Sequence, residues 1–176
     1  MLARIGVIPQ AVDPADSDET PRKNELPLAY AKRMAAEKAG IVALRHAGAC
    51  ILAADTVVAV GRRILPKAET QDQARECLSL ISGRRHRVHC AVTLIDSRGT
   101  ARHRVSTTIV IFKRLSAREI DAYIASEEWH GKAGGYAIQG RAEAFVRSLI
   151  GSHSGVIGLP LFETQALLTA SGISNG

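Results

Sequence analysis

Residues 51–60 read Ile51-Leu52-Ala53-Ala54-Asp55-Thr56-Val57-Val58-Ala59-Val60, a nearly continuous apolar run that is rich in β-branched side chains. Such a run is typical of a β-strand that is buried on both faces. Asp55 is the one carboxylate within it. Because an unpaired buried carboxylate is costly, Asp55 needs a cation, a set of hydrogen bonds or a ligand. Taken alone, it fits equally well a strand-end carboxylate that accepts hydrogen bonds from neighbouring backbone amides.

The residues after this run predict a hairpin. Gly61-Arg62 has the composition of a two-residue turn, and residues 63–67 return antiparallel to the strand. With that turn, Lys67 lies opposite Thr56. A carboxylate and an ammonium at one strand end suit a metal-bound polyphosphate, because the carboxylate can hold the ion or a water while the Lys offsets phosphate charge. An ordinary Asp–Lys ion pair is the plainer interpretation, and a register error of one residue would change the pairing.

The composition favours one globular domain over residues 1–176. The chain is 46% hydrophobic and 23% charged, and its 176 residues allow a sizeable core with room for two lobes. The net charge of +6 permits an anionic partner such as a nucleotide. Aromatic residues make up only 4% of the chain, which leaves few stacking platforms for single-stranded nucleic acid. We therefore do not expect nucleic acid as a partner, although a basic nucleic-acid-binding module remains the competing hypothesis.

The three cysteines and the hydropathy pattern bear on location. Cys50, Cys77 and Cys90 lie in apolar runs and share no CxxC spacing, which predicts buried, reduced thiols in a cytoplasmic protein. No apolar run approaches the length needed to span a membrane, and residues 1–10 are too few and too polar for a signal peptide. We expect a cytoplasmic chain without membrane contact.

Periodicity and capping signals predict helices on both sides of the central run. The first residues, Leu2 to Val7, look like the last turn of a helix that ends at Gly6 and enters a short strand. A longer helix is predicted from Glu25 to Ala39, with Gly40 as its stop. The other predicted elements are helices that start at the capping boxes Thr70–Gln73 and Ser116–Glu119 and at Pro160, and strands His86–Ile95, Arg102–Lys113 and Ala144–Ile150.

Several polar residues are candidates for a site, each with a plainer alternative. The acidic segment from Asp13 to Pro21 could hold a divalent metal, but a solvated loop is favoured on spacing alone. Lys38 suits the dipole of a helix C-terminus and also points toward the central strand. Four glycines in residues 131–140 indicate backbone close to a ligand or to another strand. Gln139 in that stretch could hydrogen-bond a base edge or stabilise a turn.

Two further patterns argue against other chemistries. His86 and His89 fall on opposite faces of their predicted strand, so a shared zinc ion is not expected. Ser152-His153-Ser154 suggests a nucleophile, but the sequence has no third partner and no GxSxG elbow, which argues against a serine hydrolase.

Taken together, several stretches resemble the Maf family of nucleoside triphosphate pyrophosphatases, and their order and spacing run through nearly the whole chain. They are Ala36-Glu37-Lys38-Ala39, Ala54-Asp55-Thr56-Val57-Val58, Lys67, Ser82-Gly83-Arg84, Gly131-Lys132-Ala133-Gly134-Gly135-Tyr136-Ala137-Ile138-Gln139-Gly140 and Gly158-Leu159-Pro160-Leu161.

The resemblance implies both a fold and a reaction. The expected fold is α/β, a single bilobed domain of the Maf/ITPase-like type with a twisted mixed β-sheet flanked by helices and a nucleotide cleft between the lobes. The implied reaction hydrolyses nucleoside triphosphates to monophosphate and pyrophosphate with a divalent metal cation, Mg²⁺ or Mn²⁺. Family members are commonly dimers, so a homodimer is possible here.

The resemblance also assigns roles by position. Asp55 matches the family's general base, and Glu19 matches an acidic residue that helps Asp55 hold the metal. Lys38 and Lys67 match lysines that contact phosphates. Thr56 and Gln139 match the pair that marks the subfamily acting on dTTP and UTP, whereas the 7-methyl-GTP subfamily usually carries Gln and Glu at these positions.

One departure from the family pattern lies at the N-terminus. Family members begin with a strand and a Ser-x-Ser-Pro-Arg-Arg loop that contacts phosphates, and the sequence from Met1 has no counterpart. This predicts either a start codon placed too late or a weakened relative, since each lost charge-assisted contact costs about 1.5–3 kcal/mol. The alternatives to a dTTP/UTP pyrophosphatase are a nucleotide-binding protein with little turnover and a 7-methyl-GTP pyrophosphatase.

Overall fold

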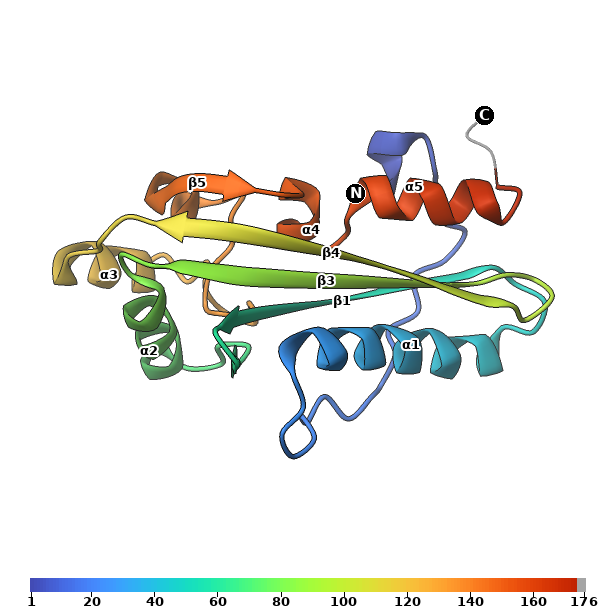
Figure 1. Cartoon of the computed structure of the whole chain (residues 1–176), viewed down its shortest axis with the longest axis horizontal. Coiled ribbons are helices and arrows are strands. Elements are labelled where there is room, and N and C mark those ends of the chain that lie inside the picture. Colours follow the sequence, from blue (N-terminus) through green and yellow to red (C-terminus); the bar gives the residue numbers. More distant parts are fainter. Residues whose placement is uncertain (174–176) are drawn as a thin grey trace.

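A five-stranded sheet runs the length of the molecule, as the computed structural model shows for residues 1–173 (Figure 1). Its strands are β1 (Ile51–Val60), β2 (Arg63–Leu65), β3 (Arg85–Ile95), β4 (Ala101–Phe112) and β5 (Val146–Ile150), in the spatial order β2-β1-β3-β4-β5. The predicted α/β class is confirmed, with one correction. All four strand pairings are antiparallel, so the sheet is not mixed. Short turns connect β1 to β2 and β3 to β4, as in antiparallel hairpins, whereas β2 and α2 lie between β1 and β3, and α3 and η2 lie between β4 and β5.

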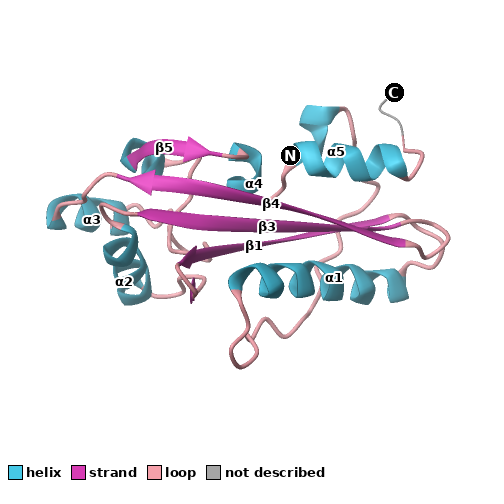
Figure 2. Cartoon of the chain, viewed as in Figure 1, coloured by secondary structure: helices cyan, strands magenta, loops and turns pink. Residues whose placement is uncertain are grey.

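Helices cover both faces of the sheet (Figure 2). They are η1 (Leu2–Ile5), α1 (Pro27–Arg45), α2 (Gln71–Ile81), α3 (Ala117–Ile124), η2 (Arg141–Phe145), α4 (His153–Ile157) and α5 (Leu161–Ala170). Helix α1 packs along β1 and β3, while α5 lies across the sheet from it at the same end of the molecule. Helices α2 and α3 pack on each other at the other end.

Buried apolar side chains form separate clusters at these two ends, as a bilobed form requires. The largest cluster joins α2 and α3 to the sheet and includes Leu78, Phe112 and Tyr123. A second cluster packs α1 against Val57 and Ala91, and a third packs α5 against the opposite face of β3. The long strands β1, β3 and β4 pass through both ends.

The predicted hairpin has the expected register but ends earlier than expected. Gly61 adopts a left-handed φ of 60° in the turn, and Val58 pairs with Leu65. Beyond Leu65 the chain leaves the strand, and Lys67 pairs with Ala133 instead of Thr56. Within residues 1–173, no strand therefore pairs with the outer edge of β1 at residues 51–57. This uncovered edge is where the candidate site lies.

Other local predictions differ in outcome. Both capping boxes are confirmed, at Thr70 and at Ser116. Helix α1 does not stop at Gly40, because its last turns bury Val42 against Ile51. The first residues form a short 3₁₀ helix that ends at Gly6, and no strand follows it before α1.

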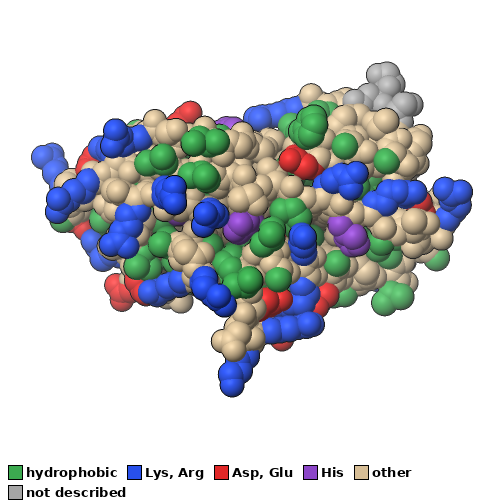
Figure 3. Space-filling view, viewed as in Figure 1, with side chains coloured by type: hydrophobic (Ala, Val, Ile, Leu, Met, Phe, Trp, Pro, Cys, Tyr) green, Lys and Arg blue, Asp and Glu red, His purple; other side chains and the backbone are tan. Residues whose placement is uncertain are grey.

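Surface chemistry also adds two observations. Cys50 is exposed, so the prediction that all three thiols are buried is wrong for this residue, while Cys77 and Cys90 are buried. Lys and Arg side chains are spread along the whole visible face with carboxylates among them (Figure 3).

No helix within residues 1–173 combines the length and the apolar character that crossing a lipid bilayer requires.

Candidate active site

Asp55 lies in the middle of β1 and is only 7% exposed. The Lys38 ammonium, which reaches the strand from α1, donates a hydrogen bond to Asp55 Oδ1 at 2.6 Å. Burial raises the pKa of Asp55 above its ordinary value, although the hydrogen bond from Lys38 acts in the other direction. The carboxyl is therefore a stronger base than an exposed Asp, and it is held by a partner from another element.

Glu19 joins this pair from the loop before α1. Lys38 Nζ lies 2.7 Å from Glu19 Oε1, so one ammonium bridges two carboxylates. The second oxygen of Glu19 accepts a hydrogen bond from Lys67. Burial works to raise the pKa of Glu19, but the bonds from the two lysines lower it below its ordinary value. Asp55, Lys38, Glu19 and Lys67 thus form a chain of alternating charge.

The two lysines of this chain differ in the exposure of their side chains. Lys38 has a side chain that is 16% exposed, whereas that of Lys67 is 46% exposed. Burial tends to lower the pKa of Lys38, but its bonds with Asp55 and Glu19 raise it above the ordinary value. The Lys38 ammonium is therefore a fixed charge inside the site, while Lys67 presents its charge to solvent.

Two adjoining cavities of about 300 and 270 Å³ open at the uncovered edge of β1. Four residues line both of them: Asp55, Thr56, Lys67 and Ala133. Glu19 lines the first cavity, and Lys38 and Gln139 line the second. The predicted site residues therefore come together around one cleft, although they lie as far apart as residues 19 and 139. The combined volume of the two cavities suits a small-molecule ligand.

The glycine-rich stretch lines the second cavity. The sequence left open whether its glycines lie close to a ligand or to another strand, and the contacts of Gly134 show a strand. Gly134 has a left-handed φ of 68°, and a Cβ at this position would lie 2.7 Å from a Val58 methyl carbon. Its N–H donates to the Pro66 carbonyl at 2.9 Å. The backbone of this stretch therefore needs glycine because it packs on β1, and this packing carries Gln139 to the cleft.

Thr56 leaves β1 on the face opposite to Asp55. Its hydroxyl donates a hydrogen bond to Cys90 Sγ at 3.1 Å across the β1–β3 pairing. The link between α4 and α5 approaches from the other side, where a Cβ on Gly158 would lie 4.0 Å from Thr56 Oγ1. Thr56 lies on a neutral wall of the cleft, in contrast to the charged wall at Asp55.

Comparison with known proteins agrees with this geometry. The model of a family described as "Maf-like protein" matches residues 1–171. The chain belongs to the Maf-like protein family. Similar Maf-like relatives include proteins named "dTTP/UTP pyrophosphatase" from Rhodospirillum rubrum, 60% identical over all of this chain and 84% of the relative, and from Zymomonas mobilis, 62% identical over 98% of this chain and 85% of the relative. A protein of that name from Novosphingobium aromaticivorans is 58% identical over 98% of this chain and 86% of the relative.

The donor set of this Maf-like site fits a divalent cation only in part. Within residues 1–173, no group of three or more His, Cys, Asp and Glu side chains is arranged to hold a metal ion. Asp55 and Glu19 nevertheless converge on one cationic group, the Lys38 ammonium, so two hard oxygen donors face one position. Mg²⁺ and Mn²⁺ suit such donors, and Mg²⁺ usually takes one or two protein carboxylates together with waters and substrate phosphate. The two carboxylates fit that share of a metal site.

Two residues of the cleft were not singled out from the sequence. Lys132 lines the second cavity with an exposed side chain. Its place within the glycine-rich stretch of residues 131–140 was the available signal. Tyr30, on α1, lines the first cavity, and its hydroxyl donates to the Glu19 carbonyl at 2.6 Å. A Tyr on an apolar helix stripe carries no signal of its own, because the same pattern describes an ordinary core residue.

Proposed function

We propose that this chain is a nucleoside triphosphate pyrophosphatase that hydrolyses dTTP and UTP to the monophosphate and pyrophosphate. The observation that carries the proposal is the alternating chain of Asp55, Lys38, Glu19 and Lys67 at the mouth of a cleft. The names of relatives at 53–62% identity over nearly the full chain support the same substrates.

In this proposal, Asp55 acts on the attacking water. In the proposed step, water attacks the α-phosphorus, its proton passes to the Asp55 carboxylate, and the bond to the bridging oxygen of pyrophosphate breaks. Burial raises the pKa of Asp55, which makes it a better base than an exposed Asp. Lys38 fixes the orientation of this carboxylate through its 2.6 Å hydrogen bond.

The two lysines offset the charge of the polyphosphate. The exposed Lys67, which is paired with Glu19, would also meet incoming phosphate oxygens, and the less exposed Lys38 would supply a fixed positive charge beside the reacting group. Asp55 and Glu19 would hold the divalent cation, Mg²⁺ or Mn²⁺. When bound, this ion neutralises polyphosphate charge.

Thr56 and Gln139 form the proposed contacts to the pyrimidine base. Both line the second cavity, which Glu19 does not line. Gln139 offers a donor and an acceptor, and Thr56 offers a hydroxyl, so both can contact the polar edge of a pyrimidine. A homodimer and a cytoplasmic location are further parts of this proposal.

Pyrophosphate release from a panel of triphosphates tests the proposal. The full chain is incubated with dTTP, UTP, CTP, ATP, GTP and 7-methyl-GTP in the presence of Mg²⁺ or Mn²⁺. We expect release mainly from dTTP and UTP, and at least about 100-fold less with Asp55→Asn. Nucleotide affinity measured on the same samples separates the alternative, because tight binding without release would indicate a binding protein.

A further inference from the structure

The hydroxyl of Thr56 forms a hydrogen bond with a buried thiol on the neighbouring strand. Thr56 on β1 pairs directly with Cys90 on β3, and its Oγ1 donates to Cys90 Sγ at 3.1 Å. Cys90 is 1% exposed, and burial raises the pKa of its thiol to about 12. The thiol is therefore neutral at physiological pH.

This contact decides which hydrogen-bonding group the cleft receives from Thr56. A hydroxyl has one proton and two lone pairs. Because the proton points at Cys90 in the strand pairing, the lone pairs remain for a ligand in the two cavities that Thr56 lines. Without the sulfur, the same hydroxyl could rotate and act as a donor toward the cleft.

The pyrimidines differ in what they present to such a group. Uracil and thymine carry an N–H donor at N3, whereas cytosine has an acceptor at N3. A hydroxyl fixed as an acceptor favours the first two bases, and one that is free to rotate can satisfy either. A site that fixes a polar group discriminates more strongly than an adaptable one, because the wrong base leaves a buried polar group unpaired.

We propose that Cys90 is a positioning residue for base selection, which holds the Thr56 hydroxyl as an acceptor toward the base and so favours uracil and thymine over cytosine. This inference rests on the proposed function. Cys90 would act on base choice through Thr56, without touching the substrate. This role gives a reason for a weak hydrogen-bond acceptor beside the Thr56 hydroxyl.

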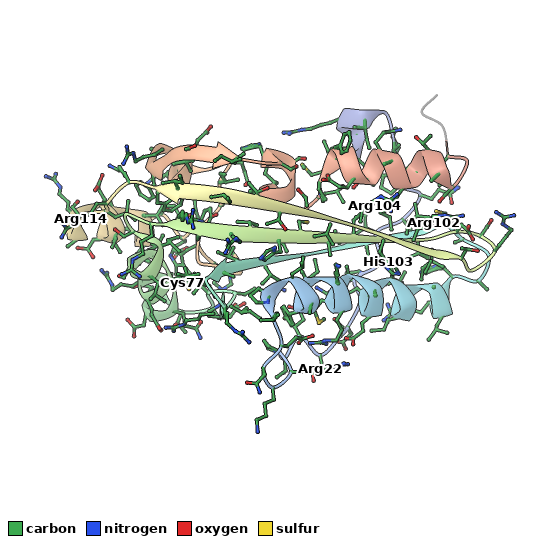
Figure 4. The ribbon with its side chains drawn as sticks, viewed as in Figure 1. Arg22, Cys77, Arg102, His103, Arg104 and Arg114 are labelled. Atoms are coloured by element: carbon green, nitrogen blue, oxygen red, sulfur yellow. The ribbon has the colours of Figure 1, made fainter. Side chains whose placement is uncertain are left out.

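The test compares kcat/KM for UTP and CTP in the full chain and in Cys90→Ala. We expect the UTP-to-CTP ratio to fall about tenfold in Cys90→Ala, chiefly through a gain with CTP, because the freed hydroxyl can donate to N3. The matched control is Cys77→Ala. Cys77 is an equally buried thiol that lies on α2 and lines neither cavity (Figure 4), and its removal should leave the ratio unchanged.

A double-mutant cycle makes the readout specific to this contact. In a Thr56→Val background the hydroxyl is gone, so adding Cys90→Ala should not change the ratio further. Cys90→Val, which has a side chain of similar size without a hydrogen-bonding group, serves if Cys90→Ala does not fold. The Thr56 hydroxyl again loses its partner on β3, so the ratio should again fall.

The outcomes distinguish a failure of the proposed function from a failure of the role proposed for Cys90. If the unsubstituted chain releases no pyrophosphate from UTP, the proposed function fails. If it does, and Cys90→Ala or Cys90→Val keeps the wild-type ratio or slows all nucleotides equally, this inference alone is wrong.

Discussion

The two faces of β1 differ in charge, although Asp55 on one face and Thr56 on the other are consecutive residues. Asp55 points toward α1 and enters a network of two carboxylates and two ammonium groups. Thr56 points to the other face, where its partner is the neutral thiol of Cys90. Because side chains alternate along a strand, one uncovered strand edge can present both kinds of surface to a single cleft. A group suited to phosphate chemistry and a group suited to base contacts thus lie on consecutive residues.

This difference has an electrostatic reason. Similar neutral bases are distinguished by the donors and acceptors on their edges, so base choice needs polar groups held in a fixed orientation. Reaction at a triphosphate needs the opposite, because charge has to be neutralised at fixed positions. Substitutions on the charged face should therefore change the rate with every nucleotide, while those on the neutral face should change which nucleotide is preferred.

The largest contrast is expected between the two lysines of the charged face. Lys38→Met leaves the buried Asp55 without its ammonium partner, which should cost about 3–5 kcal/mol of stability, as for other broken buried pairs. Lys67→Met breaks a more exposed pair and should cost less than about 1 kcal/mol. Both should lower kcat/KM roughly 10- to 100-fold with every nucleotide.

Urea unfolding and pyrophosphate release at several pH values check this contrast. In Lys38→Met, removal of the hydrogen bond from the ammonium raises the pKa of Asp55 further, so the activity should require a higher pH. Lys67→Met should shift the pH profile less. Equal losses of stability in the two variants would contradict the role of Lys38 as an internal partner of Asp55.

The sequence predicts the local parts of this arrangement well. The hairpin after β1 and the capping boxes depend on a few adjacent residues, and these predictions are confirmed. The position of Lys67 depends on its pairing with Ala133, 66 residues later, and no local pattern contains that information. The length of α1 likewise follows from the packing of Val42 on Ile51, which overrides the helix-stopping tendency of Gly40.

The site itself shows the same limit. Asp55 stands out because a carboxylate in an apolar strand needs a reason, whereas Glu19 is one of several acids in a loop and was found only through the family resemblance. The contact between Thr56 and Cys90 depends on the register between β1 and β3, which are separated by β2 and α2. Its significance could therefore be read only from the folded chain.

A pH-dependent stability is expected from the neutral face. His86, on the same face of β3 as Cys90, is 1% exposed, and its Nε2 lies 2.8 Å from the Tyr136 hydroxyl. Burial lowers the pKa of His86 from 6.5 to about 4. Between these values the unfolded chain binds a proton that the folded chain does not, so stability falls as the pH is lowered. The loss should approach about 3 kcal/mol by pH 4.

Urea unfolding between pH 7 and pH 4 measures this dependence. His86→Gln removes the titrating group and should flatten the curve in that window. His103→Gln, at an exposed position on β4, provides the control and should keep the wild-type slope. An unchanged slope in His86→Gln would show that other groups govern the acid sensitivity.

The smallest expected effect concerns Gln139, which is exposed on the glycine-rich stretch and so should contribute little to stability. Gln139→Glu replaces an amide donor with a carboxylate acceptor, which disfavours the carbonyl oxygens of uracil and favours the amino group of cytosine. The UTP-to-CTP ratio of kcat/KM should fall about tenfold, while the sum of kcat/KM for the two nucleotides should change less. Gln71→Glu makes the same chemical change at the start of α2, outside both cavities, and should leave the ratio unaltered. Equal slowing with all nucleotides in Gln139→Glu would mean that this residue supports the reaction rather than base choice, and the division between the two faces of β1 would then not extend to the glycine-rich stretch.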